Sequence, residues 1–319
     1  MNAFQQTSYQ FPRQTAFYRG KVRDVYEIEE QVLVLIASDR ISAFDVILPA
    51  PIPHKGQVLN QTAAYFLNSL KNIVPNHFLV SPDPNVTLAL KCNPFPVEVV
   101  VRGYLCGHAW RVYAAGERTL CGNKLPDGLR ENDPFPEPII TPAIKSKFGH
   151  DEDISEYEIL KSKLLDEEDW FPIRHYALQL YHEGTKSAEK QGLILADTKY
   201  EFGTFEDKIL LIDEVHTPDS SRYFWADGFS ERQQAGESQM HLSKEFVREW
   251  LLSQGFHGQE GASPPPMSSE IITEIRQRYI QLYEQITGQH FEPRNYSAST
   301  EQELFEKTVQ TLLDMGLKV

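Results

Sequence analysis

The sequence has few cysteines and lacks the short motifs that mark several common enzyme sites. Its three cysteines, Cys92, Cys106 and Cys121, are odd in number and have no CxxC spacing, which argues against a disulfide framework and a zinc knuckle. No HExxH or GxSxG pattern is present, so zinc hydrolases and serine hydrolases gain no support. The P-loop and Rossmann glycine patterns are missing as well.

Long hydrophobic runs and positive net charge are also lacking. The longest purely apolar run, Val32–Ala37, is far shorter than the roughly 20 residues of a membrane-spanning helix, and the polar start Met1–Gln10 has no signal-peptide core. Acidic residues outnumber basic ones by 45 to 31, and the net charge of −14 would repel a polyanion. We therefore expect a cytoplasmic protein whose partners include neither membranes nor nucleic acids.

What the sequence does contain changes in character along its 319 residues. Strand patterns dominate the first hundred residues, and the stretch Cys121–Pro142, rich in Pro, Gly and Asn, predicts a long ordered loop or flap. Helical patterns dominate the end. This order favours an α+β protein with two lobes and a C-terminal helical extension. The predicted divisions are a β-rich lobe at 1–102, a mixed α/β lobe at 103–232 and a helical region at 233–319.

Hydrophobic periodicity and capping residues predict the individual elements. Acidic residues after His150 indicate either a metal site or a helix N-terminus, and we favour the helix for Glu152 and Asp153. Capping boxes are expected at Ser155 with Glu158 and at Thr300 with Glu303. The expected strands are Lys21–Ile28, Val32–Ala37 and Val97–Val101, and the expected helices are Val58–Leu70, a stretch from about Ile173 to Gly192, Lys244–Gln254, Ser268–Ile286 and Thr300–Met315.

A predicted hairpin, Gly192–Gly203 with Ile209–Val215, carries the most informative pattern. Asp197, Lys199 and Glu201 alternate along one strand and therefore share one face. A turn near residue 206 or 207 would place Asp213 opposite Glu201 to within one residue. Opposed carboxylates repel each other unless a cation lies between them, which predicts a Mg²⁺ site. The alternative is a solvated sheet face on which Lys199 neutralises its neighbours.

Basic residues recur at turns and strand ends. Arg19–Asp24 places a glycine beside Lys21 and Arg23, which suits phosphate oxygens, although such a segment is also typical of an ordinary turn. Arg102 and Arg222 follow buried strands and could each bind an anion with two donors or form an ion pair at the sheet rim. Cations gathered in an acidic protein indicate a local anion-binding region.

Five segments together resemble, in order and spacing, the SAICAR synthetase family (phosphoribosylaminoimidazole-succinocarboxamide synthases). They are Gly20–Asp24, Asp39–Asp45, Pro96–Gly103, Asp197–Gly203 and Asp213–Arg222. Phe135–Pro142 and His150–Ser155 resemble the longer, yeast-like form. The resemblance implies an ATP-binding fold with kinase-like and ATP-grasp-like lobes. It also implies a carbon–nitrogen ligase of purine biosynthesis that converts ATP, L-aspartate and the imidazole carboxylate nucleotide CAIR to ADP, phosphate and SAICAR, through an acyl phosphate.

The resemblance also implies roles for individual residues. The catalytic groups would be Lys199 and Lys21, and the Mg²⁺ ligands Glu201 and Asp213. The ATP-binding residues would be Lys21, Arg23, Glu98 and Lys145. The substrate-binding residues would be Asp39, Arg102, His108, Asp151, Ser221 and Arg222.

One residue departs from the family pattern. Relatives carry Gly-Ser where this chain has Gly107-His108, so an imidazole replaces a serine expected at the CAIR phosphate. A small-molecule kinase is the runner-up function, and a nucleotide-binding regulatory protein is a third. The regulatory alternative predicts the loss of a metal carboxylate, whereas Glu201 and Asp213 are both present. The oligomeric state stays open.

Overall fold

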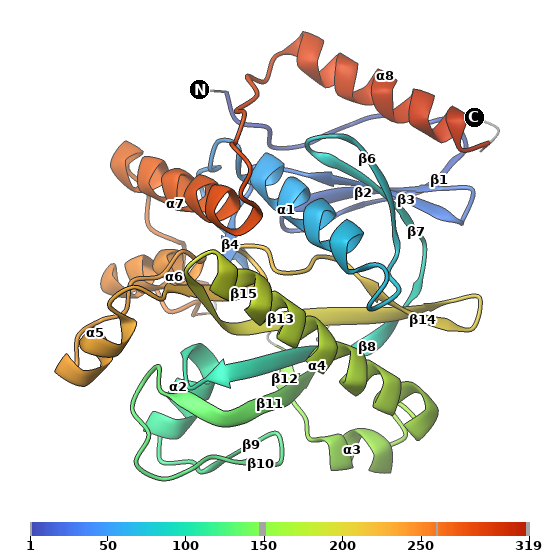
Figure 1. Cartoon of the computed structure of the whole chain (residues 1–319). Helices are drawn as coiled ribbons and strands as arrows, with labels where there is room; N and C mark the ends of the chain where they lie inside the picture. The colour runs from blue at the N-terminus through green and yellow to red at the C-terminus, as the bar shows by residue number, and fades with distance from the viewer. Residues whose placement is uncertain (1, 147–150, 260, 317–319) are drawn as a thin grey trace. The chain divides into compact units, whose positions relative to one another are not determined.

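The computed structural model describes residues 2–146, 151–259 and 261–316, and its chain forms two compact units. Unit 1 comprises Met1–Asn68, His77–Lys91 and Phe246–Val319, and unit 2 comprises Ser69–Asn76 and Cys92–Glu245. The two compact units do not coincide with the three predicted stretches, because the C-terminal helices belong to the same unit as the N-terminal strands (Figure 1). The predicted boundaries at 102 and 232 stay a prediction.

Unit 1 is built on a five-stranded antiparallel sheet in the order β1-β2-β3-β7-β6. In β2, Asp24, Tyr26 and Ile28 are buried and alternate with partly exposed residues, the period of a strand with one covered face. The strands are β1 (Gln14–Arg19), β2 (Arg23–Ile28), β3 (Val32–Ala37), β6 (Phe78–Asp83) and β7 (Val86–Leu90). A short hairpin, β4 (Ser42–Ala43) with β5 (Val46–Ile47), follows β3.

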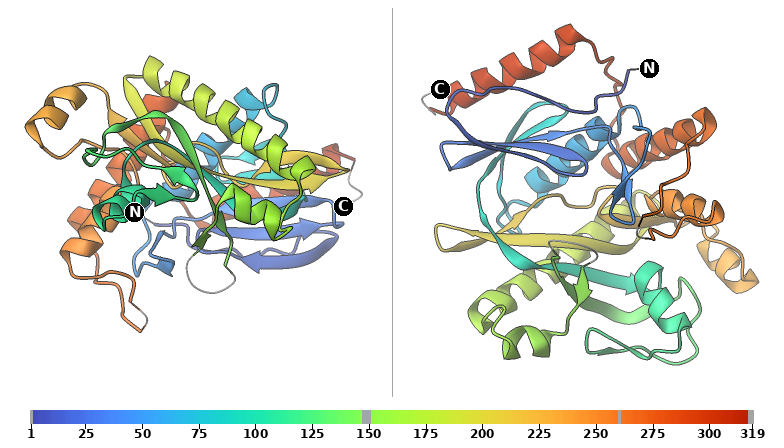
Figure 2. Two further views of the ribbon diagram at one scale, coloured as in Figure 1. Left: turned by 90° about the horizontal axis from the view of Figure 1, so that it is seen from below. Right: turned by 180° about the vertical axis from the view of Figure 1, so that it is seen from behind.

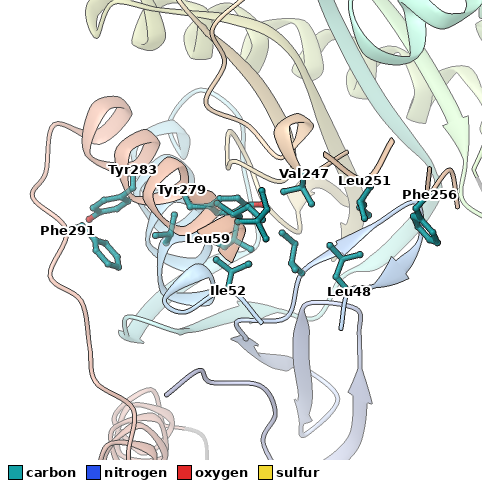
Figure 3. Close-up of a cluster of buried hydrophobic side chains, with 14 residues drawn as sticks. Leu48, Ile52, Leu59, Val247, Leu251, Phe256, Tyr279, Tyr283 and Phe291 are labelled. Atoms are coloured by element: carbon teal, nitrogen blue, oxygen red, sulfur yellow. The ribbon is translucent and has the colours of Figure 1, made fainter. Parts of the chain in front are cut away.

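Four helices complete unit 1, and three of them share a buried hydrophobic cluster. Tyr279 and Tyr283 of α7, Val247 and Leu251 of α6, and Leu59 of α1 meet in it (Figure 3). Residues at helical spacing thus place one apolar face of each helix in a common core. The helices are α1 (Lys55–Leu70), α6 (Glu245–Ser253), α7 (Ser269–Thr287) and α8 (Ala298–Asp314).

The fourth helix, α8, covers the sheet of unit 1. Its Leu304 and Leu312 pack in a second cluster with Phe4, Phe11 and Tyr26, and α8 runs beside the strands in both views (Figure 1; Figure 2, right). Its cap was predicted three residues too late. Ser297 accepts the Thr300 N–H, and the Thr300 hydroxyl oxygen accepts the Ser297 N–H, because a threonine can fill the role that we had assigned to Glu303.

Unit 2 is built on a six-stranded antiparallel sheet in the order β12-β11-β8-β13-β14, with β15 paired to β13. Helix α4 lies across one face of it (Figure 1; Figure 2, left), and its Tyr181 donates a hydrogen bond to the Leu195 carbonyl of β13. The strands are β8 (Asn93–Tyr104), β11 (Pro134–Ile144), β12 (Glu152–Asp153), β13 (Leu193–Phe205), β14 (Lys208–Ile212) and β15 (Ser221–Trp225), with a separate hairpin of β9 (Thr119–Leu120) and β10 (Asn123–Lys124). The helices are α2 (Gly107–Ala114), α3 (Glu156–Lys161), α4 (Glu167–Lys190) and α5 (Phe229–Ala235).

The structure confirms the informative hairpin and corrects its surroundings. Glu201 pairs with Ile212, so Asp213 lies one residue from the position opposite Glu201, within the predicted margin, and the capping box at Ser155 is present. The predicted flap Cys121–Pro142 instead contains β10 and most of β11, because the prolines that suggested a loop lie beside a bulge between Pro134 and Ile139. Glu152 and Asp153 form β12 rather than a helix N-terminus, because they pair with β11 before α3 begins. His150 lies outside the described residues.

No helix in the described part of the chain is long and apolar enough to cross a membrane.

Candidate functional site

Strand β13 organises the charged residues of unit 2. Its neighbours β8 and β15 place Arg102 and Arg222 directly opposite Asp197, and β8 also places Glu98 opposite Glu201. Side chains two residues apart on a strand share a face, so Asp197 and Glu201 lie on the same face of the sheet. The charged residues form two groups on that face, which we name the lysine–carboxylate cluster and the arginine cluster.

The lysine–carboxylate cluster consists of Glu98, Lys145, Lys199 and Glu201. Lys199 Nζ lies 3.1 Å from Glu98 Oε2 and also donates to Glu201. Lys145 Nζ lies 2.5 Å from the other Glu201 oxygen, and the Lys145 backbone N–H donates to the Pro96 carbonyl at 2.9 Å, which fixes this residue at the end of β11. The cluster therefore joins three strands through alternating charges.

Burial and charge pull the pKa values of this cluster in different directions. Burial would raise the pKa of Glu201, but the Lys199 and Lys145 ammonium groups outweigh it and lower that pKa to about 2. Burial also raises the pKa of Glu98, and there Lys199 offsets it only in part. The pKa of Lys199 is raised well above its ordinary value because the nearby carboxylates, Asp213 among them, outweigh burial. Glu201 is therefore held ionised and ready to bind a cation.

The donor chemistry of these carboxylates fits Mg²⁺. Glu201 and Asp213 offer hard oxygen ligands, and Mg²⁺ is commonly held by one or two carboxylates together with substrate phosphates and water. Within residues 2–146, 151–259 and 261–316, no three His, Cys, Asp or Glu side chains gather as a ready-made metal cage. Glu201 and Asp213 could thus hold an ion that shares its ligands with a phosphorylated substrate.

The arginine cluster consists of Arg102, Asp197, Arg222 and Glu245. Asp197 Oδ2 accepts hydrogen bonds from Arg102 Nη1 at 2.7 Å and from Arg222 Nη1 at 2.5 Å. Arg222 Nη2 donates to Glu245 Oε2 at 2.6 Å. Arg102 is buried and its Nε donates to the Thr141 hydroxyl at 2.9 Å, so one carboxylate orients both guanidinium groups.

Glycine at position 107 is required by the arginine cluster. Gly107 begins α2 with a φ of +55°, and a Cβ atom there would overlap the Arg222 guanidinium group. The next residue, His108, lies beside β12, and its Nε2 is 2.6 Å from Asp153 Oδ2. That hydrogen bond lowers the pKa of Asp153. The imidazole that replaces the expected serine is thus paired with a carboxylate.

Two further predicted substrate residues bond to the protein itself. Ser221 is buried, and its hydroxyl donates to the Thr198 hydroxyl oxygen at 2.8 Å. Asp151 Oδ1 accepts the Ser146 N–H at 2.8 Å. Both lie in unit 2, and their substrate contacts stay predictions.

The remaining predicted residues belong to unit 1. Lys21 is half exposed and forms an ion pair with Asp45, while Arg23 begins β2. Asp39 is fully buried and accepts the N–H groups of Phe4 at 2.8 Å and Gly56 at 3.0 Å, at the start of α1. Burial raises the pKa of Asp39 to about 6. Its oxygens anchor the backbone, and its substrate contact stays a prediction.

Sequence reasoning missed four residues that the structure connects to the predicted ones. Asp197 and Arg40 lie in motif segments, yet only the fold shows that Asp197 joins two arginines and that Arg40 reaches the turn before β2. Asp153 and Glu245 gave no local signal for their pairing with His108 and Arg222, because each pair is far apart in the sequence.

Comparison with known proteins identifies the relatives of this chain. The family model "SAICAR synthetase" matches residues 16–265. A phosphoribosylaminoimidazole-succinocarboxamide synthase of Cytophaga hutchinsonii is 57% identical over 291 residues, covering 91% of this chain and 94% of its own. The enzyme of Bacteroides thetaiotaomicron is 53% identical over 314 residues, covering 98% and 99%. The solved Saccharomyces cerevisiae SAICAR synthase complexed with SAICAR is 35% identical, with a TM-score of 0.75 over 88% of this chain and 96% of that one.

Proposed function

The chain belongs to the SAICAR synthetase family and is an ATP-dependent ligase of purine biosynthesis, and on that premise we propose that it joins L-aspartate to the carboxylate of CAIR. The products would be SAICAR, ADP and phosphate. The observation that carries this proposal is the single face of β13, on which a lysine–carboxylate cluster lies next to an arginine cluster. The lysine–carboxylate cluster would support phosphoryl transfer, and the arginine cluster would bind an anionic nucleotide.

The chemistry requires activation of a carboxylate. The amine of aspartate does not displace an oxygen from an unactivated carboxylate, because the leaving group is poor. We propose that a carboxylate oxygen of CAIR first attacks the terminal phosphorus of ATP, which forms an acyl phosphate and releases ADP. The aspartate amine then attacks the acyl carbon, the carbon–oxygen bond to phosphate breaks, and the amine loses a proton as the amide forms.

The lysine–carboxylate cluster supplies the positive charge for the first step. Lys199 and Lys145 would offset charge on the transferring phosphoryl group, because such transfers depend mainly on positioning and electrostatics. Glu201 and Asp213 would hold Mg²⁺, which when bound neutralises phosphate charge. Glu98 lies against Lys199 and would keep its ammonium group directed into the cluster.

The arginine cluster would bind the CAIR nucleotide. Arg222 Nη2 pairs with Glu245, and an anionic substrate would take the place of that carboxylate, while Asp197 keeps the guanidinium plane fixed. Arg102 would support the same region through Asp197. His108 and Ser221 are proposed near the CAIR phosphate, Asp151 and Asp39 near substrate, and Lys21 and Arg23 at the ATP phosphates. A cytoplasmic location is part of the proposal.

The decisive experiment measures ADP release from ATP with CAIR, in the presence and absence of aspartate. A ligase should release ADP in stoichiometric balance with SAICAR, and its sustained turnover should require the amine. Sustained ADP release with CAIR alone, and a phosphorylated product that persists, would instead establish a small-molecule kinase. No ADP release under either condition would exclude both.

A further inference from the structure

The turn between β1 and β2 has all three of its carbonyl oxygens bonded to the protein. Arg40 Nη2 donates to Gly20 O at 3.1 Å, and Arg40 Nε donates to Lys21 O at 3.2 Å. Val22 O accepts the Ser38 N–H at 2.9 Å and the Ser38 hydroxyl at 2.8 Å. The backbone orientation of the turn is therefore fixed by two side chains from the segment after β3.

Arg40 is itself firmly anchored. Its Nη2 lies 2.8 Å from Asp24 Oδ1, its Nη1 donates to the Gln5 carbonyl, and only 10% of its side chain is exposed. Asp24 is buried and also accepts the Thr7 N–H and hydroxyl, at 2.7 and 2.9 Å. The guanidinium group is thus held before any ligand arrives.

The bonded oxygens determine where the N–H groups of the turn point. In a planar trans peptide the N–H group points opposite to the C=O group. Since Gly20 O and Lys21 O both face Arg40, the N–H groups of Lys21 and Val22 face away from it, on the same side. Adjacent N–H groups aimed in one direction beside a lysine attract an anion.

We infer that Arg40 is a positioning residue for the ATP phosphates, which acts by fixing the peptide planes of the Gly20–Val22 turn and does not itself touch the nucleotide. This inference rests on the proposed function, in which Lys21 contacts those phosphates. Arginine is required because its planar fork reaches two adjacent carbonyls and a carboxylate at once. A lysine keeps the charge but concentrates its donors at one atom.

The test compares Arg40→Lys with Arg294→Lys as a matched control. Arg294 also belongs to unit 1, pairs with the buried Asp83 and has 15% of its side chain exposed, but its guanidinium group donates to Asp83 and to the Thr300 carbonyl and not to the turn. Calorimetric titration with a non-hydrolysable ATP analogue should show about five- to tenfold weaker binding for Arg40→Lys. Its KM for CAIR and aspartate should stay within about twofold. Arg294→Lys should lower the melting temperature without changing the ATP affinity.

A second variant, Ser38→Ala, tests the inference independently in case Arg40→Lys does not fold. Ser38→Ala removes one of the two donors to Val22 O without removing a charge, and should weaken ATP binding about two- to threefold. Unchanged ATP affinity in both folded variants would overturn the inference, as would a uniform rise in all three KM values. Lys21→Ala with wild-type ATP affinity would also overturn it, yet would leave the ligase intact if ADP release still required aspartate. Wild-type protein that binds no ATP would overturn the inference and the proposed function together.

Discussion

Asp39, which is fully buried, and Glu201, whose side chain is 18% exposed, lie in different units and show how the bonding partner decides whether a carboxyl group is ionised. Asp39, at the start of α1, is satisfied by backbone N–H groups, and its pKa rises to about 6 because burial outweighs them. Glu201, on β13, is satisfied by two ammonium groups, and its pKa falls to about 2 although burial opposes this. At Asp39 the backbone N–H groups do not outweigh burial, whereas at Glu201 two full positive charges do.

The two residues therefore suit different roles, anchoring of the backbone for Asp39 and the proposed cation binding for Glu201. Asp39 holds the chain around α1 and tolerates a proton, while Glu201 keeps its negative charge at any ordinary pH. We expect the region around β13 to control turnover and the start of α1 to control stability, and variants in each region test this division.

The largest effect is expected at the metal carboxylates. Glu201→Gln and Asp213→Asn should each reduce Mg²⁺-dependent turnover by about a thousandfold or more, because each removes a charge from the cation site. Folding should persist, as judged by circular dichroism and melting temperature. Glu206→Gln, on the exposed turn of the same hairpin, is the control and should behave as wild type. Wild-type turnover across a Mg²⁺ titration for either variant would show that the metal lies elsewhere.

The next effect concerns stability and pH at Asp39. An acid with a raised pKa in the folded state keeps its proton on folding, so its stabilising contribution is present below about pH 4 and is lost as the pH rises through about 6. The free energy of unfolding of wild type minus that of Asp39→Asn should therefore fall by about 3 kcal/mol over this range and be flat above about pH 7. Urea unfolding at several pH values measures it. A difference independent of pH would mean that folding does not change the pKa of Asp39.

A smaller effect is expected at Arg222. Arg222→Lys should raise the KM for CAIR by about tenfold to a hundredfold, and the KM for ATP by much less, because lysine loses the fork that Asp197 orients. Arg232→Lys, on α5, serves as the control arginine. Equal changes in both KM values would contradict the assignment of the arginine cluster to CAIR.

The smallest effect is expected at His108. One ring nitrogen of His108 already pairs with Asp153, which leaves only the other for the CAIR phosphate. We expect the CAIR Kd of His108→Ser to be about two- to threefold higher than that of wild type, measured by calorimetric titration at one pH, the effect of one lost hydrogen bond. An unchanged Kd would make His108 a bystander bonded to Asp153.

Local sequence patterns predicted individual helices and strands better than they predicted which strands pair. The hairpin of β13 and β14 was found because alternation and a turn are both local, and α7 because its apolar residues repeat at helical spacing. Strand β11 was missed because its prolines look like a loop, although pairing with β8 on one side leaves room for them. Short helices such as α2 and α5 carry too few periodic residues to be recognised.

The sequence predicted which residue types form the candidate site, but not which of these residues bond to one another. Lys199 and Glu201 could be placed on one face from spacing alone, since both lie on one strand. Arg102 and Asp197 are 95 positions apart, and Arg40 lies 20 positions from Gly20, so their hydrogen bonds depend on how strands pair. No local rule indicates that Glu245 meets Arg222.

The packing of α8 on the N-terminal sheet has a consequence for how the protein is made. Chains emerge from the ribosome N-terminus first, at about 5–20 residues per second. Unit 2 lies almost entirely within residues 92–245 and can fold as soon as they emerge, whereas the cluster around Tyr26 must wait for Leu304 and Leu312. After unit 2 has emerged, the first sheet thus stays uncovered for roughly a further 3–13 seconds while the residues up to Leu312 are added. A nascent chain that stalls in that interval would expose the apolar face of its first sheet to chaperones and proteases, although unit 2 has already folded.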